Sequence, residues 1–180
     1  MLGHYGRKGP KATPLLLGST ADLALRTLLC PVILVKRTVS VGPRYYVFAV
    51  DFSSTSKKGL DILLSLVTPR DTLRLIYIRH TSAAAAKQDD SAADTDAINN
   101  KEYYYYDNEL QENGPVDSAF TYIDVPEEVS VFEAIVDHVS GPHMPDFLAI
   151  APRALAEEGI NANTEYIIAH APMSVILCKN

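Results

Sequence analysis

Short runs of apolar, often β-branched residues alternate along the chain with segments whose apolar residues recur every three or four positions. The first pattern is typical of buried strands and the second of helices that pack on one face. Strands are predicted at 32–35, 45–50, 72–78, 120–125, 147–151 and 174–178, and helices at 19–29, 53–67, 97–111, 131–139 and 164–171. Strands that alternate with helices form a parallel sheet with right-handed crossovers, so the pattern predicts an α/β fold.

The chain contains a partial internal repeat in which a helical pattern is followed by an apolar strand. Residues 31–36 (PVILVK) and 174–179 (SVILCK) are identical at four of six positions, at a constant offset of 143. A helix–strand pair therefore occurs twice. Because an uncovered apolar strand edge tends to pair with another strand, we predict that Val32–Val35 pairs with Val175–Cys178, within one chain or between two.

The stretch from 81 to 115 differs from the rest of the chain and is predicted to be a flexible insertion. Alanines and acidic residues make it a polar, low-complexity segment between 83 and 94. We expect a mobile loop from Ser82 to about Asp94, because the segment has no apolar anchors to offset its ordering entropy. A crossover helix follows, since parallel strands need a long connection.

Four consecutive tyrosines, Tyr103 to Tyr106, lie within this predicted crossover helix. One interpretation is an aromatic surface for a partner. The other is a helix with one buried face and several half-buried faces, and we favour it because aromatic residues at helical spacing usually pack internally.

The composition indicates a globular domain and argues against some kinds of binding partner. Apolar residues make up 47% and charged residues 21%, as in an ordinary globular domain. The net charge of −6 argues against binding to nucleic acid. No apolar run reaches the roughly 18 to 20 residues that span a bilayer, so no membrane contact is expected. Two cysteines, Cys30 and Cys178, fit a reducing, cytoplasmic location.

Several glycines precede the first predicted helix. Gly3, Gly6 and Gly18 precede Ser19, which is the first residue of the helical pattern. Glycines let backbone amides approach an anion, and a helix N-terminus carries partial positive charge. The alternative is a turn followed by a helix that Ser19 caps.

The order of these residues resembles the motif of the universal stress protein family. In that family Gly-two residues-Gly-about nine residues-Gly-Ser/Thr is followed by a helix and a Pro-Val strand, here Pro31-Val32. The loop between Gly6 and Gly18 holds eleven residues, slightly more than in the family. The resemblance implies an open, doubly wound, mostly parallel five-stranded sheet of the adenine-nucleotide alpha-hydrolase-like kind, with an extra helix–strand segment at the N-terminus.

The resemblance also implies an unusual domain layout. Residues 1–37 match the end of a first domain, 38–43 form a linker, and 44–180 match one complete domain. We therefore expect a fragment of a tandem protein, or a gene product that starts late.

In the family the nucleotide site lies where the first and fourth strands end, which here means Asp51 and the loop after Ala151. Asp51 matches the aspartate implied to contact the nucleoside, although a cap for the next helix is the alternative. The loop does not match, because Ala151 and Ala154 replace glycines and Glu157 and Glu158 would repel phosphates. We therefore expect a degenerate site that binds ATP poorly.

The resulting prediction is a stress-associated binding module without catalysis, which self-associates through its last strand as a homodimer. The candidate nucleotide-binding residues are Gly3, Gly6, Gly18, Ser19 and Asp51, and we assign no catalytic residue and no metal ligand. The alternative is an ATP- or AMP-binding stress protein that uses the N-terminal glycine loop, with slow hydrolysis. No cofactor is firmly predicted, and ATP or AMP is the ligand of the alternative.

Overall fold

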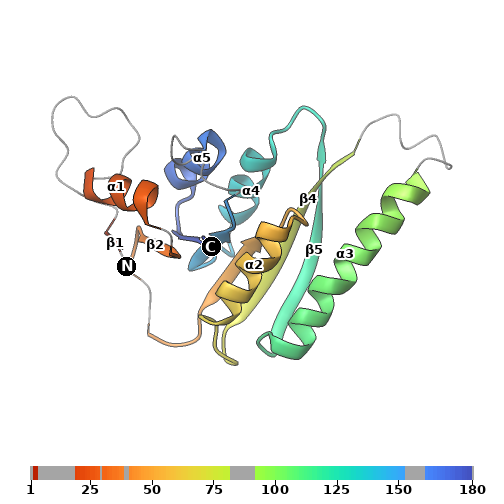
Figure 1. Ribbon diagram of the computed structural model, residues 1–180, viewed down its shortest axis with the longest axis horizontal. Coiled ribbons are helices and arrows are strands. Elements are labelled where there is room, and N and C mark those ends of the chain that lie inside the picture. Colours follow the sequence, from red (N-terminus) through yellow and green to blue (C-terminus); the bar gives the residue numbers. More distant parts are fainter. Residues whose placement is uncertain are drawn as a thin grey trace.

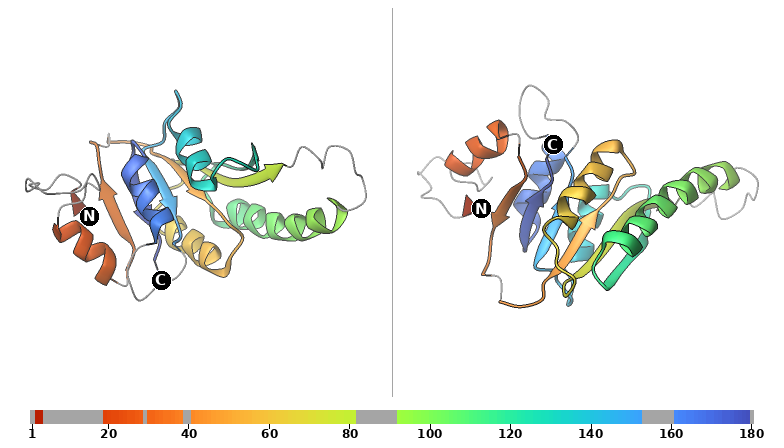
Figure 2. Two further views of the ribbon diagram at one scale, coloured as in Figure 1. Left: turned by 90° about the horizontal axis from the view of Figure 1, so that it is seen from above. Right: turned by 60° about the horizontal axis from the view of Figure 1, so that its bottom comes forward.

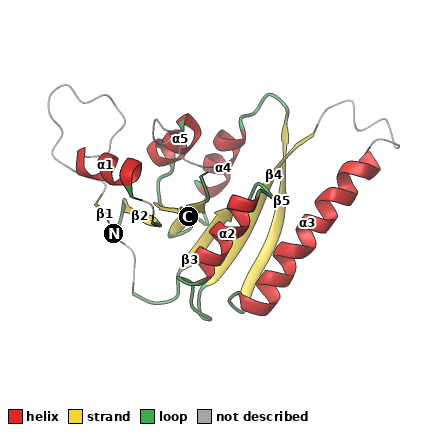
Figure 3. Cartoon of the chain, in the orientation of Figure 1, coloured by secondary structure: helices red, strands yellow, loops and turns green. Residues whose placement is uncertain are grey.

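The computed structural model describes residues 2–3, 19–28, 30–38, 41–81, 92–152 and 161–179 of the chain. Seven strands form one sheet in the order β1-β2-β7-β6-β3-β4-β5 (Figure 1). The strands are β1 (Leu2–Gly3), β2 (Val32–Val35), β3 (Tyr45–Ala49), β4 (Thr72–Thr81), β5 (Asp117–Pro126), β6 (Phe147–Ile150) and β7 (Ser174–Leu177) (Figure 3). The helices are α1 (Ser19–Thr27), α2 (Ser54–Leu64), α3 (Ala92–Asn113), α4 (Val131–Val139) and α5 (Ala162–His170).

Five of the strands, β3 to β7, form the doubly wound parallel sheet that the sequence predicts. β3 lies at its centre, with β4 and β5 on one side and β6 and β7 on the other. The chain therefore changes direction across the sheet between β3 and β6, which is where such folds bind ligands. The predicted α/β fold class is confirmed.

The N-terminal segment extends this sheet by two strands. β2 pairs with β7 in antiparallel orientation, with Val32 opposite Leu177 and Leu34 opposite Val175. The predicted pairing between the two repeats is thus present within one chain. β1, which the sequence pattern did not predict, adds a short parallel pair to the outer side of β2.

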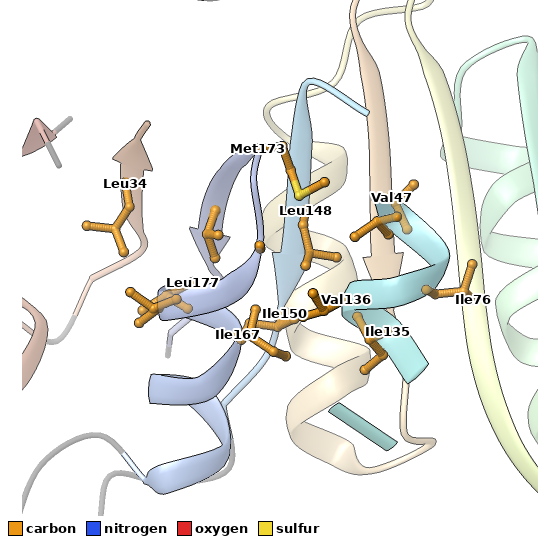
Figure 4. Packing of buried hydrophobic residues seen from close by; sticks show 14 of the residues in the cluster. Leu34, Val47, Ile76, Ile135, Val136, Leu148, Ile150, Ile167, Met173 and Leu177 are labelled. Atoms are coloured by element: carbon orange, nitrogen blue, oxygen red, sulfur yellow. The ribbon is translucent and has the colours of Figure 1, made fainter. Parts of the chain in front are cut away.

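Helices cover both faces of the sheet (Figure 2). One core cluster joins α4, α5 and Leu25 of α1 to the strands, and Figure 4 shows Ile135, Val136 and Ile167 meeting Leu148 and Ile150. A second cluster, on the opposite face, joins α2 and α3 to the sheet. Because helices bury both faces of the sheet, the sequences of the central strands are continuous apolar runs.

The crossover helix is longer than predicted. α3 begins at Ala92, so the last residues of the predicted loop are helical. Alanine favours helix, and an acidic residue near a helix N-terminus, here Asp94, complements the helix dipole, which fits this early start. Residues 82–91 of that loop lie outside the described part of the chain. β4 and β5 are also longer than predicted and pair along their whole length, from Thr72 to Thr81. None of the described helices is long and apolar enough to cross a membrane.

The tyrosine run packs α3 onto the sheet. Tyr106 is fully buried, Tyr103 and Tyr105 are half-buried, and Tyr104 is 62% exposed. The ring of Tyr103 meets Phe120 of β5 edge to face, with centroids 5.2 Å apart. The internal-packing interpretation of the run is therefore confirmed.

Candidate functional site

A tight turn at the end of β3 fixes Asp51 at the carboxyl edge of the sheet. The Oδ1 atom of Asp51 accepts hydrogen bonds from the backbone N (3.1 Å) and the Oγ (2.5 Å) of Ser53. Ser53 is in turn the N-cap of α2, because its Oγ accepts from the backbone N of Ser56. Asp51 thus helps to hold the turn that caps the helix, and its side chain is exposed.

The next residue, Phe52, adopts a left-handed backbone conformation with φ of 58°. For a residue with a Cβ this conformation costs about 1–2 kcal/mol. Aromatic packing offsets the cost, since the Phe52 ring stacks on Tyr77 with centroids 4.3 Å apart and lies parallel to Phe120. The turn that carries Asp51 is therefore anchored to β4 and β5.

The end of β6 lies close to α2 at one point. A Cβ on Gly59 would lie 2.6 Å from the Cβ of Ala151, 3.2 Å from Cζ of Phe48 and 3.4 Å from the Cβ of Cys178. Glycine at position 59 therefore allows α2 to approach the strands at the site. Ala151 and Pro152, which follow β6, are half-buried there.

A cavity of about 330 Å³ opens at the carboxyl ends of β3 and β6. Its volume is at the lower end of the range for small-molecule sites, about 300–1,000 Å³. The walls are mostly apolar and come from both strand ends, α4 and α5. The lining residues are Ala49, Val50, Asp51, Val131, Phe132, Ile135, Ile150, Ala151, Pro152, Asn161, Asn163, Thr164 and Ile167.

The polar groups of the cavity lie at strand and helix ends. Asn161 is the N-cap of α5, and its Oδ1 accepts from the backbone N of Thr164 at 2.8 Å. Asn161 and Asn163 are exposed, whereas Thr164 is buried. Together with Asp51 they offer donors and acceptors around an apolar interior, as small-molecule sites commonly do.

Among the described residues, none that lines the cavity carries a positive charge. Arg153, Ala154, Glu157 and Glu158, which lie in the loop between β6 and α5, fall outside the described residues. Within the described part, no group of three or more His, Cys, Asp or Glu side chains is arranged to hold a metal ion.

The structure separates Gly3 from Asp51. Gly3 is the last residue of β1, which lies at the far end of the sheet, with β2, β7 and β6 between it and β3. Because β2 is antiparallel to β7, the carboxyl end of β1 is at the opposite edge from Asp51. Ser19 begins α1, and Gly6 and Gly18 lie outside the described residues.

The strand registers show that the glycine loop starts, relative to β2, where the loop after β6 starts relative to β7. Leu2 lies opposite Leu34 in β2, as Ile150 lies opposite Leu177 in β7, and Leu177 is the repeat partner of Leu34. Gly3 therefore corresponds to Ala151. In the described chain no strand lies beyond β1, so nothing there corresponds to β3 and Asp51.

Sequence reasoning located Asp51 and the loop after Ala151 but missed the apolar walls. The helical pattern at 131–139 was interpreted only as a buried stripe, although it includes Val131, Phe132 and Ile135, and Asn161 was assigned no role. The order of the elements could have indicated these wall residues, because the helix after β5 packs beside the carboxyl ends of the central strands, where such folds bind ligands.

No protein-family model matches the sequence, and no curated protein matches it. Solved structures do match its fold. A putative universal stress protein from Pseudomonas aeruginosa UCBPP-PA14 has a TM-score of 0.63 and 16% identity, covering 98% of this chain and 61% of that one. A universal stress protein from Archaeoglobus fulgidus has a TM-score of 0.58 and 18% identity, covering 92% and 55%. This chain thus spans about three fifths of these two proteins.

A third match is a universal stress protein family protein from Arabidopsis thaliana with AMP bound, with a TM-score of 0.52, 16% identity, and coverage of 74% of this chain and 89% of that one. The chain therefore has the fold of universal stress proteins, as the sequence motif predicted.

Proposed function

We propose that the chain is a universal-stress-protein-like, non-catalytic binding module, and that its cavity takes the nucleoside part of an adenine nucleotide. The observation that carries the proposal is the position of the cavity at the point where strand order reverses, with Asp51 at its rim. The Arabidopsis neighbour, which has AMP bound, supports the same ligand class.

The chemistry of the cavity favours a flat, mostly apolar ligand body with polar edges. Ile135, Ile150 and Ile167 supply apolar surface, and Asp51 supplies a carboxylate that can accept hydrogen bonds from sugar hydroxyls. Burial of the apolar part of the ligand contributes about 25 cal/mol per Å².

We further propose that the site holds phosphates weakly. Tight phosphate binding uses backbone amides freed by glycines, together with basic side chains. At this site Ala151 stands where the N-terminal loop has Gly3, and no described wall residue is basic. Added phosphates therefore contribute little affinity, and ATP is expected to bind no better than adenosine.

Calorimetric titration of the full chain with adenosine, AMP and ATP tests the proposal. We expect similar, weak affinities for all three, and loss of binding when a tryptophan fills the cavity in Val131→Trp. Glu133→Ala, at an exposed position of the same helix, is the matched control and should bind as the natural protein does. Absence of adenosine binding, or a much higher affinity for ATP than for adenosine, would overturn it.

The same titration distinguishes the second candidate function, ATP or AMP binding at the N-terminal glycine loop. This second candidate is supported by the equivalence of Gly3 with Ala151. The glycine loop follows β1 as the loop of the proposed site follows β6. If that loop were the site, micromolar ATP binding would survive Val131→Trp and disappear in Gly18→Val. Production of ADP during the titration would indicate the slow hydrolysis that we do not propose.

A further inference from the structure

One buried polar group lies beside the turn that carries Asp51. Tyr106 of α3 is fully buried, and its Oη atom has no hydrogen-bond partner among the described residues. Buried tyrosine hydroxyls usually find a partner, because a buried donor that is left unsatisfied lowers the stability of the fold. Phenylalanine would fill the same space without this cost, which indicates that the hydroxyl is used in another state of the protein.

The packing of α3 brings this hydroxyl to the turn. The Tyr106 ring contacts the ring of Phe52, with centroids 5.7 Å apart, and Phe52 directly follows Asp51. Ser56, in the first turn of α2, is 1% exposed and acts on the same hydroxyl. Burial raises the pKa of Tyr106, whereas the Ser56 side chain lowers it and the charge of Asp51 raises it further. Both polar groups are therefore close to the buried hydroxyl.

The turn itself has weak points in the same place. The backbone N of Asp51 donates to the Oγ of Ser56 at 3.4 Å, which is longer than the usual range of about 2.7–3.2 Å. Phe52 has the left-handed backbone conformation described above, and strain of this kind is concentrated at ligand sites and switch regions. A long hydrogen bond, a strained residue and an unpartnered hydroxyl thus coincide at one turn, on the rim of the cavity.

We propose that Tyr106 makes the cavity selective for ligands with sugar hydroxyls, by acting through Ser56 on Asp51. When a sugar hydroxyl donates to the Asp51 carboxylate, the turn tightens, and the Oη of Tyr106 donates to the Oγ of Ser56, which can accept a second hydrogen bond. Tyr106 does not line the cavity, so it is a positioning residue. The proposal rests on the proposed function, because it takes Asp51 to contact the sugar.

Opposite effects on stability and on affinity follow from this one unsatisfied group. In Tyr106→Phe the free protein no longer contains the unpartnered donor, so it should unfold at a higher temperature. The complex loses a hydrogen bond that forms only when the ligand binds, so adenosine should bind about tenfold more weakly, equivalent to about 1.4 kcal/mol. A residue that only supports the fold would instead lose stability and affinity together.

The decisive experiment titrates the full chain with adenosine and with 2′,3′-dideoxyadenosine, which lacks both hydroxyls of the sugar ring. NMR chemical shifts follow the binding, because they measure weak affinities. We expect Tyr106→Phe to bind adenosine about tenfold more weakly than the natural protein does, and the dideoxy compound within about twofold of it. Tyr104→Phe, which removes an exposed hydroxyl from the same run, is the matched control and should change neither affinity.

A second variant tests the path through α2. Ser56→Ala removes the proposed acceptor and should also weaken adenosine binding. Adding Tyr106→Phe to Ser56→Ala should weaken binding no further, because the two side chains act through one hydrogen bond. Additive losses in the double variant would show that they act independently, which contradicts the proposal.

Three further results would overturn the proposal. One is unchanged adenosine binding in Tyr106→Phe. Another is equal weakening of both nucleosides, which would mean that Tyr106 supports the cavity as a whole. The third is a Tyr106→Phe variant less stable than the natural protein, which would show that the hydroxyl has a partner in the free protein. If the natural protein binds neither nucleoside, the proposed function itself is wrong, and this proposal fails with it.

Discussion

Lys36 and Lys179 occupy equivalent positions, each after the strand of one repeat and each bound to the carbonyl end of the other repeat's helix. Burial lowers the pKa of Lys36 to about 8 and also lowers the pKa of Lys179. The cost of desolvating two ammonium groups is offset by carbonyls that would otherwise lack donors. The two helix–strand repeats are therefore joined by matched polar contacts as well as by the strand pair.

The close contact at Gly59 predicts that Gly59→Ala destabilises the fold. In an unconstrained helix the change would add about 1 kcal/mol of stability. Here the new methyl group would overlap Ala151, and such overpacking costs about 1–3 kcal/mol. Urea unfolding should therefore show a net loss for Gly59→Ala.

Lys58→Ala, at an exposed neighbouring position of α2, is the control and should change stability by less than about 0.5 kcal/mol. Adding Ala151→Gly to Gly59→Ala removes the closest contact and should restore part of the loss. A Gly59→Ala variant that is more stable than the natural protein would contradict the packing described for the site.

The left-handed turn at Phe52 predicts an unusual order of substitutions. Phe52→Ala loses the stacking on Tyr77 and keeps the backbone strain, so it should cost about 2 kcal/mol of stability. Phe52→Gly loses the same stacking but relieves the strain, so it should be about 1 kcal/mol more stable than Phe52→Ala. Thermal unfolding of the two variants measures the difference, and the ordinary order, with alanine above glycine, would argue against the strained turn.

The tyrosine run predicts that adjacent residues respond very differently to truncation. Tyr106→Ala should lower the free energy of unfolding by about 3–5 kcal/mol, because the ring is fully buried between α3 and the sheet. Tyr104→Ala removes an exposed ring and should change it by less than about 0.5 kcal/mol. Chemical denaturation measures the free energy of unfolding of both variants. Similar losses of stability for the two would mean that α3 is rotated relative to the sheet.

Cys178 predicts a pH dependence of stability. Burial raises the pKa of its thiol from 9.0 to about 12, so the unfolded chain loses this proton at lower pH than the folded chain. The thiol's contribution to stability is complete below pH 9 and is lost as the pH rises from 9 towards 12. Between pH 8 and pH 10 the natural protein should lose about 1.4 kcal/mol more than Cys178→Ala. Parallel unfolding curves at the two pH values measure this difference, and equal losses would show that the thiol titrates normally in the fold.

The sequence by itself determined the elements and the general place of the site. Apolar periodicity depends only on residues close together in the chain, so it located the five strands of the doubly wound sheet and the helices between them. The uncovered apolar edge of residues 32–35, together with their near-identity to 175–178, predicted that β2 and β7 pair. Asp51 could be placed because strand ends in such sheets converge on one edge.

Only the tertiary structure decided which side chains meet. The walls of the cavity come from α4, α5, β3 and β6, and position 59 has no room for a methyl group because α2 closely approaches the end of β6. The antiparallel direction of β2 placed Gly3 at the edge opposite Asp51, a relation that the sequence motif does not contain. Strand direction and helix approach depend on contacts between residues far apart in the chain, and local patterns of hydrophobicity do not contain that information.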